Sequence, residues 1–218
     1  MTEDMSRGAE YGIIFGELSR RRFYKAGAGR NERAERENTC MGDGSMSREN
    51  VIFIGFMGAG KTSVGRAYAR AAGIPLVDTD QMIEEEAGMT ISDIFRLKGE
   101  EFFRETETAV LKKLQKETEP KVISVGGGLP LREENRAVLR ELGQVIFLQV
   151  KAETVIERLK GDTTRPLLQG PDVRQRAEEL LAYRNPIYRQ AAHQIVDVDG
   201  KTVEEIVNLI REKEGTNR

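Results

Sequence analysis

Residues 51–62 read VIFIGFMGAGKT, and the type of fold can be predicted from this stretch. The run Val51–Phe56 is short and almost wholly apolar, as expected for a strand that is buried on both faces of a sheet. Gly55–Thr62 then matches the pattern G-x-x-x-x-G-K-[ST] at every fixed position, and a helical pattern follows. This order of strand, loop and helix predicts a phosphate-binding loop (P-loop), in preference to a glycine-rich turn that carries a lysine by chance.

The residue types of this loop suit a nucleoside triphosphate bound with Mg²⁺. Glycines let backbone N–H groups turn inward around phosphate oxygens, and the helix that follows directs its positive end at them. We expect Lys61 to reach the β- and γ-phosphates and the Thr62 hydroxyl to bind the metal ion. The predicted nucleotide-binding residues of the loop are Gly58, Ala59, Gly60, Lys61, Thr62 and Ser63.

The rest of the chain from residue 51 alternates between short apolar runs and helical periodicity. This alternation predicts an α/β fold in which a doubly wound, five-stranded parallel sheet is covered by helices on both faces. Near the carboxyl terminus, Thr202 and Glu205 have the spacing of a capping box at the start of the last helix. The predicted strands are Val51–Phe56, Pro75–Asp78, Lys121–Val125, Gln144–Val150 and Gln194–Val198.

The first 45 residues differ in composition from the remainder. They contain 8 basic and 8 acidic residues and only one short apolar patch, Ile13–Phe15, so they can bury little surface. An arginine-rich presequence is the alternative, but such segments are poor in acidic residues. We therefore expect a poorly ordered extension over residues 1–45 and a single domain over residues 46–218.

Composition excludes several classes of protein. The chain has 34 basic and 36 acidic residues and a net charge of −2, so no large positive field would attract nucleic acid or an anionic membrane. It has a single cysteine, Cys40, and no apolar run long enough to span a bilayer. These features predict a cytoplasmic protein that binds small molecules and neither nucleic acid nor membrane, and we expect a monomer.

Two further sites follow predicted strands at their carboxyl ends, where ligands of open α/β sheets bind. Asp78 and Asp80 flank Thr79 after one strand, so one carboxylate could serve the metal ion and the other a hydroxyl, although Asp80 could instead only cap the next helix. Gly126–Gly128 follow another strand and would let a ligand approach the backbone, although a plain turn would also explain them.

Four arginines are candidates for binding anionic groups. A phosphoryl acceptor that carries a carboxylate needs guanidinium groups for bidentate recognition, and a transferring phosphoryl group needs cations around it. Each arginine could alternatively be a solvated surface charge, whereas His193, the only histidine, is expected to be structural. The candidates are Arg104, Arg158, Arg165 and Arg184.

Taken in order, these motifs resemble the shikimate kinase family, and the resemblance extends from about Val51 to Ile210. The P-loop alone is common to many kinases, motors and GTPases, but the ordered set is specific. It comprises Gly55–Thr62, Asp78-x-Asp80, Phe103-Arg104-x-x-Glu107, Gly126–Gly128, Arg165-Pro166-Leu167-Leu168 and Arg184-x-Pro186-x-Tyr188.

The resemblance implies a role for each matching residue. Asp80 would hold the reacting hydroxyl, Arg104 and Arg184 would bind the substrate carboxylate, and Glu107 would orient Arg104 or bind a hydroxyl. Lys61 and Arg165 would stabilise charge on the phosphates, with Arg165 on a mobile lid at about residues 161–172. The remaining implied contacts are to substrate from the backbone of Gly126, Gly127 and Gly128, to Mg²⁺ from Thr62 and Asp78, and to adenine from Arg158, with Asp199–Thr202 nearby.

The implied reaction is transfer of the γ-phosphoryl of ATP to the 3-hydroxyl of shikimate, a step toward chorismate and the aromatic amino acids. Two alternatives remain open. One is another small-molecule P-loop kinase, such as a gluconate or nucleoside monophosphate kinase. The other is a nucleotide-binding module without catalysis, which would be expected to lack at least one of Lys61, Thr62, Asp78, Asp80 and Arg165.

Overall fold

A computed structural model of the chain describes residues 49–160 and 172–216, and side chains only as far as residue 213. All five predicted strands are present, each within two residues of its expected bounds. The predicted extension and most of the predicted lid, Arg165 included, lie outside the described residues. The strands are β1 (Asn50–Ile54), β2 (Leu76–Asp78), β3 (Val122–Ser124), β4 (Gly143–Gln149) and β5 (Gln194–Asp197).

The strands form one parallel sheet in the order β2-β3-β1-β4-β5. The central strand β1 pairs with β3 through Val51 and Val122 and with β4 through Asn50 and Gly143. Strands β2 and β3 lie on one side of β1, and β4 and β5 lie on the other. The strand order therefore reverses direction at β1. The P-loop after β1 therefore lies at the switch point where ligands of such sheets bind.

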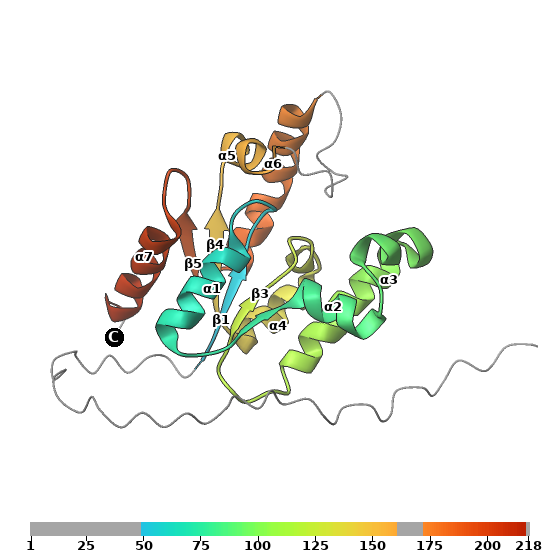
Figure 1. The fold of residues 1–218 in the computed structure, drawn as a ribbon, viewed down its shortest axis with the longest axis horizontal. Helices are drawn as coiled ribbons and strands as arrows, with labels where there is room; N and C mark the ends of the chain where they lie inside the picture. Colours follow the sequence, from blue (N-terminus) through green and yellow to red (C-terminus); the bar gives the residue numbers. More distant parts are fainter. Residues whose placement is uncertain (1–48, 161–171, 217–218) are drawn as a thin grey trace, which may run out of the picture. The chain divides into compact units, whose positions relative to one another are not determined.

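Helices cover both faces of the sheet, as the sequence predicts. Helices α1 and α7 pack together on one face, whereas α4 and α6 pack together and against β4 on the other (Figure 1). Helices α2 and α3 pack against each other beside the β2 edge of the sheet. The bounds are α1 (Lys61–Ala72), α2 (Thr79–Ala87), α3 (Ile91–Leu114), α4 (Glu133–Leu142), α5 (Ala152–Arg158), α6 (Val173–Ala191) and α7 (Val203–Thr216), with a 3₁₀ turn η1 (Leu129–Leu131).

The hydrophobic core lies on both sides of the central strand. Each residue of Val51–Ile54 is at most 1% exposed, which explains why this strand is apolar at every position and does not alternate. The capping box of α7 is confirmed: the amide of Thr202 donates to the Glu205 carboxylate at 2.8 Å, and the amide of Glu205 donates to Thr202 Oγ1 at 3.2 Å.

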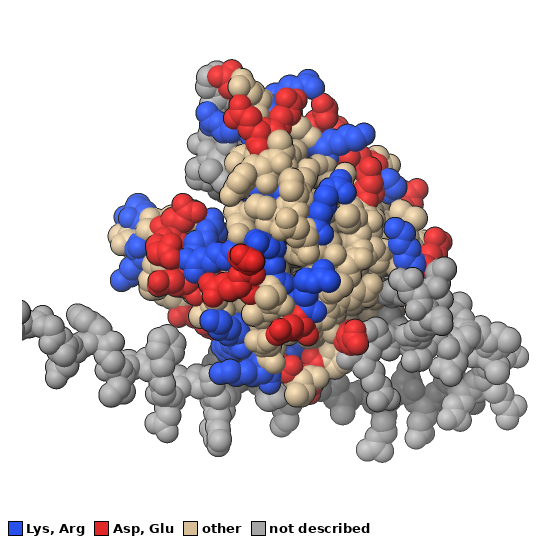
Figure 2. All heavy atoms as spheres, turned by 180° about the vertical axis from the view of Figure 1, so that it is seen from behind, with Lys and Arg blue, Asp and Glu red and all other residues tan. Residues whose placement is uncertain are grey.

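Charges of both signs are interspersed on the surface. Figure 2 shows basic and acidic side chains mixed around the face that it presents, with neither sign forming a broad field of its own. This distribution agrees with the net charge of −2. Among the helices of residues 49–160 and 172–216, none is long and apolar enough to cross a membrane.

Candidate active site

The P-loop adopts the turn that its glycines predict. Gly60 caps α1 with φ of 91°, a left-handed conformation that side chains rarely adopt, and the helix begins at Lys61. The Lys61 ammonium curls back over the loop and donates to the carbonyls of Gly55 at 3.0 Å and Phe56 at 3.1 Å. The loop thus holds a lysine and a helix amino terminus at one place, which suits the phosphates of a nucleotide.

Oxygen atoms from three elements meet beside the start of α1. The Thr62 hydroxyl donates to Asp78 Oδ2 at 2.9 Å and lies 3.2 Å from the Ser124 hydroxyl. No group of three or more His, Cys, Asp or Glu side chains in the described ranges could hold a metal ion by itself. The arrangement fits Mg²⁺, a hard cation that commonly takes one or two protein oxygens and completes its coordination with phosphates and water.

Asp78, and not Asp80, caps the second helix. The Asp78 side chain accepts a hydrogen bond from the Asp80 amide at 3.1 Å, and α2 begins at Thr79. The alternative in which Asp80 is only a helix cap is therefore wrong, because a residue inside the first turn cannot occupy the capping position. A methyl group added at Gly126 would lie 2.5 Å from Asp80 Oδ1, so a larger residue here would have to displace this carboxylate.

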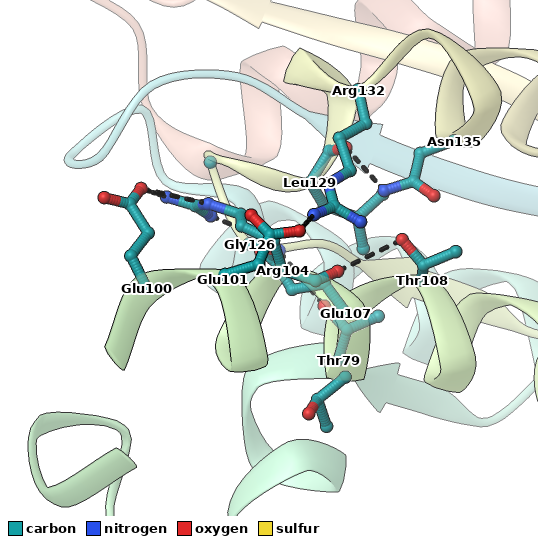
Figure 3. Close-up of polar contacts among 12 residues, drawn as sticks. Thr79, Glu100, Glu101, Arg104, Glu107, Thr108, Gly126, Leu129, Arg132 and Asn135 are labelled. Carbon is teal, nitrogen blue, oxygen red and sulfur yellow. Dashed lines mark hydrogen bonds and ion pairs between the residues drawn. The ribbon is translucent and has the colours of Figure 1, made fainter. Parts of the chain in front are cut away.

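Arg104 lies between two carboxylates of its own helix (Figure 3). Its Nη1 donates to Glu107 Oε2 at 2.7 Å, and its Nη2 donates to Glu100 Oε1 at 2.9 Å. A methyl group at Gly128 would lie 2.0 Å from Arg104 Nη1, so the triple glycine touches both Arg104 and Asp80. The structure thereby joins three of the sequence motifs in one place.

Glu107 is an unusual carboxyl group because it is only 1% exposed. Burial raises its pKa to about 7, and the hydrogen bond and positive charge of Arg104 offset only part of this effect. The negative charge of Asp80 raises the pKa further, which agrees with the placement of both carboxylates against Gly126. A carboxyl group of this kind, next to a cation and facing a loop of glycines, is typical of a functional site.

Arg184 approaches the same region from α6. Its side chain is buried over the ring of Phe56, the second residue of the P-loop, with 5.6 Å between the guanidinium carbon and the ring centre. Its Nε atom is buried and has no hydrogen-bond partner among the described residues. One turn later on α6, the Tyr188 hydroxyl donates to the Gly127 carbonyl at 2.6 Å.

Arg158 reaches the other side of the P-loop from the end of α5. Its Nη1 donates to the Gly58 carbonyl at 3.0 Å, and its Nη2 donates to the Val198 carbonyl at 3.4 Å. Asp199, which follows Val198, accepts from the Lys151 amide at 3.2 Å. Arg158 and the segment near Asp199 therefore lie close together, as the family resemblance requires of residues near one base.

Sequence reasoning missed four residues at this site. Ser124 joins the Thr62–Asp78 pair, and Thr79 Oγ1 accepts from the Gly126 amide at 3.1 Å. Both carry a signal that could have identified them, because each is a hydroxyl residue at the carboxyl end of a strand. Tyr188 stands within a quoted motif, but its role needs the fold. Arg132, which forms an ion pair with Glu101 of α3, had no signal beyond its charge (Figure 3).

Comparison with known proteins identifies the family. A sequence model described as shikimate kinase matches residues 57–213, which is well over half of the chain. The chain belongs to the shikimate kinase family. A shikimate kinase from Ralstonia nicotianae is 44% identical over 165 residues, which cover 76% of this chain and 86% of that protein. Another from Symbiobacterium thermophilum is 44% identical over 166 residues, covering 75% of this chain and 95% of that protein.

A solved structure extends the likeness to three dimensions. Shikimate kinase from Acinetobacter baumannii in complex with shikimate superposes with a TM-score of 0.74 at 35% identity, covering 78% of this chain and 94% of that one. The P-loop kinase fold predicted from the sequence is thus confirmed.

Proposed function

We propose that this chain is an ATP-dependent shikimate kinase that transfers the γ-phosphoryl group of ATP to the 3-hydroxyl of shikimate. The products are shikimate 3-phosphate and ADP. Besides the family match, one observation carries the proposal: Gly126–Gly128 lie beside the P-loop and contact three elements of the site. Gly126 lies against Asp80, Gly128 lies against Arg104, and Gly127 accepts a hydrogen bond from Tyr188 of α6, the helix that also carries Arg184. A carboxylate that can take a hydroxyl proton and two guanidinium groups that can bind a carboxylate suit a hydroxylated ring acid.

On the acceptor side, Asp80 aligns the 3-hydroxyl and takes its proton as the oxygen attacks phosphorus. Arg104 and Arg184 bind the carboxylate of shikimate. Arg104 can do so by exchanging its contact with Glu100, which is exposed, while it keeps the contact with buried Glu107. The backbone of Gly126–Gly128 lies against the ring of the substrate. Positioning of this kind supplies a large part of the rate enhancement in phosphoryl transfer.

On the nucleotide side, the amides of Gly58–Ser63 surround the phosphates and Lys61 moves from its two carbonyl contacts onto them. Thr62 and Asp78 would hold the Mg²⁺ ion, and Ser124 supports Thr62 through its hydroxyl contact. When bound, the ion neutralises charge on the β- and γ-phosphates. Arg165, which lies outside the described residues, would add a second cation, and Arg158 would lie against adenine.

A coupled assay for ADP release tests the function directly. Purified protein with ATP and Mg²⁺ is offered shikimate, gluconate, a nucleoside monophosphate or no acceptor. We expect ADP release that depends on shikimate and on Mg²⁺, with little turnover of the other acceptors. A rate on gluconate or on a nucleoside monophosphate that equals or exceeds the rate on shikimate would assign the chain to another substrate. ADP binding without turnover of any acceptor would indicate a non-catalytic module.

The catalytic unit that we propose is residues 46–218, acting as a monomer in the cytoplasm. The contacts described above all lie within this range. A truncated protein that starts at Met46 should therefore retain the shikimate-dependent rate of the full chain within about a factor of two. Sedimentation of both proteins measures their oligomeric state, and a dimer would contradict this part of the proposal.

A further inference from the structure

Tyr188 is a buried side chain to which neither its motif nor the reaction assigns a role. It is fully buried, and its ring packs on Phe147 of β4 with 5.2 Å between ring centres. Its hydroxyl donates a short hydrogen bond of 2.6 Å to the carbonyl oxygen of Gly127, a residue 61 positions away in the sequence. Burial alone would be satisfied by phenylalanine, so the hydroxyl requires its own explanation.

The hydroxyl lies near two groups of the proposed acceptor site. It donates to the Gly127 carbonyl, and the guanidinium of Arg184 is close enough for its positive charge to offset part of the effect of burial on the pKa of Tyr188. Burial raises that pKa to about 12, so the phenol stays protonated and can donate at neutral pH. The oxygen that donates to Gly127 can at the same time accept from a cation.

Gly127 also touches the P-loop. A methyl group at Gly127 would lie 3.3 Å from the Gly55 carbonyl and 3.8 Å from the Met57 amide. Arg184 contacts the same loop through the ring of Phe56. The Tyr188 hydroxyl thus bonds to the Gly127 peptide and lies near Arg184, and both of these groups lie where the acceptor site and the nucleotide loop meet.

We propose that Tyr188 is a positioning residue for the acceptor: its hydroxyl fixes the Gly127 peptide and the Arg184 guanidinium in the orientation that binds the shikimate carboxylate and ring. This inference rests on the proposed function, because it concerns the substrate site of that reaction. The rigid ring of Tyr188 on a helix is a suitable support, since a binding group gains from having its own orientation held before the substrate arrives.

The test is Tyr188→Phe, which keeps the buried ring and removes only the hydroxyl. We expect the apparent KM for shikimate to rise about tenfold, in line with the loss of one strong hydrogen bond. The apparent KM for ATP should change by less than about a factor of two. The control is Tyr68→Phe, which removes the hydroxyl of a tyrosine in α1 that is only 2% exposed, and which should leave the KM for shikimate unchanged.

A double-mutant cycle with Arg184→Ala separates positioning from general stability. If Tyr188 acts partly through Arg184, removing its hydroxyl in the Arg184→Ala background should raise the KM for shikimate by about threefold or less, compared with about tenfold in the wild type. An equal factor in both backgrounds, or equal rises in the KM for shikimate and for ATP, would overturn the inference. So would a KM for shikimate in Tyr188→Phe within twofold of wild type.

The wild-type assay distinguishes the two proposals. A wild-type protein that phosphorylates shikimate normally, together with a normal Tyr188→Phe variant, refutes the role of Tyr188 and leaves the proposed function intact. A wild-type protein without shikimate-dependent ADP release refutes the proposed function and this inference with it.

Discussion

The polar side chains at the two ends of the strands are used in different ways; we call these ends the amino edge and the carboxyl edge of the sheet. At the amino edge, polar groups bond the backbone of the chain itself: Asn50 joins the Leu142 carbonyl and the Lys121 amide, and His193 Nδ1 accepts from the Val145 amide. At the carboxyl edge, Thr62, Asp78 and Ser124 bond to one another, and Asp80 lies against glycine. Side chains at the amino edge therefore stabilise the sheet, whereas side chains at the carboxyl edge can exchange their hydrogen bonds for bonds to a ligand.

A hollow of about 520 Å³ opens at the amino edge, and Asn50, Arg140 and His193 are among the residues that line it. Arg140 Nη1 lies 3.4 Å from each of three carbonyls at the end of α6. These three side chains of the hollow are thus engaged in bonds to the backbone of the chain itself. The presence of a hollow therefore does not identify the functional site. Polar side chains that can exchange their contacts for a ligand do identify it.

Asp80→Asn removes the carboxylate at the carboxyl edge that we assign to the reacting hydroxyl. Turnover should fall by at least about 100-fold, because an amide can neither take the proton nor align the hydroxyl in the same way. ATP affinity, measured by titration calorimetry, should be nearly unchanged. Near-normal turnover would show that Asp80 has no catalytic part.

Gly126→Ala and Gly65→Ala place the same methyl group in two environments. At Gly126 the methyl would meet Asp80 and Glu107 at 2.5 and 3.0 Å, so kcat/KM for shikimate should fall about 30-fold through displacement of these carboxylates. At Gly65 it would meet Leu76 at 3.2 Å in the core, which should lower the melting temperature with little effect on KM. Equal losses of activity in the two variants would contradict the contrast.

Glu107→Gln tests the raised pKa at the carboxyl edge. In the folded state Glu107 binds its proton with a pKa of about 7, compared with 4.5 as the ordinary value. The folded state therefore binds more protons between these values, and the contribution of Glu107 to stability is present at low pH and lost as pH rises toward 7. Relative to Glu107→Gln, the wild type should lose about 2 kcal/mol of unfolding free energy between pH 5.5 and pH 8.

Urea unfolding of both proteins at several pH values measures this difference, and other titrating groups cancel in the comparison. A difference that does not vary with pH would mean that Glu107 titrates at its ordinary value.

Asn50→Ala removes a side chain that stabilises the backbone at the amino edge. Two hydrogen bonds are lost, and the Lys121 amide and the Leu142 carbonyl are left to find other partners. The unfolding free energy should fall by about 1–2 kcal/mol. At the same time kcat and both KM values should stay within about twofold of wild type. A large rise in the KM for shikimate would show that the two edges are coupled.

His193→Asn should give the smallest effect, with a pH dependence opposite to that of Glu107. Burial lowers the pKa of His193, and the nearby charge of Arg140 lowers it further. The unfolded state then binds the proton more readily, so the wild type should lose stability relative to the variant as pH falls below about 6.5. Asparagine keeps an acceptor for the Val145 amide, and thermal unfolding at pH 5.5 and 7.5 measures the difference. A change of the same sign as for Glu107 would contradict the pKa direction.

Much of the fold could be predicted because the relevant signals are local. The buried strands are short apolar runs, and the capping box of α7 depends on residues three positions apart. Which of Asp78 and Asp80 caps the second helix could not be determined from the sequence, because either carboxylate can do so and only the observed start of the helix decides between them. The contact between Tyr188 and Gly127 spans 61 positions, and no local pattern indicates it.

The P-loop, the parallel sheet and the ordered motifs of the family could all be recognised in the sequence alone. These properties follow from periodicity and from residues that act within one turn or one strand end. The contacts of Gly126 and Gly128 with Asp80 and Arg104, and the bond from Tyr188 to Gly127, could be found only from the folded chain. The physical reason is that parallel strands far apart in the chain end at one edge, so side chains from separate motifs meet there only after the sheet has formed.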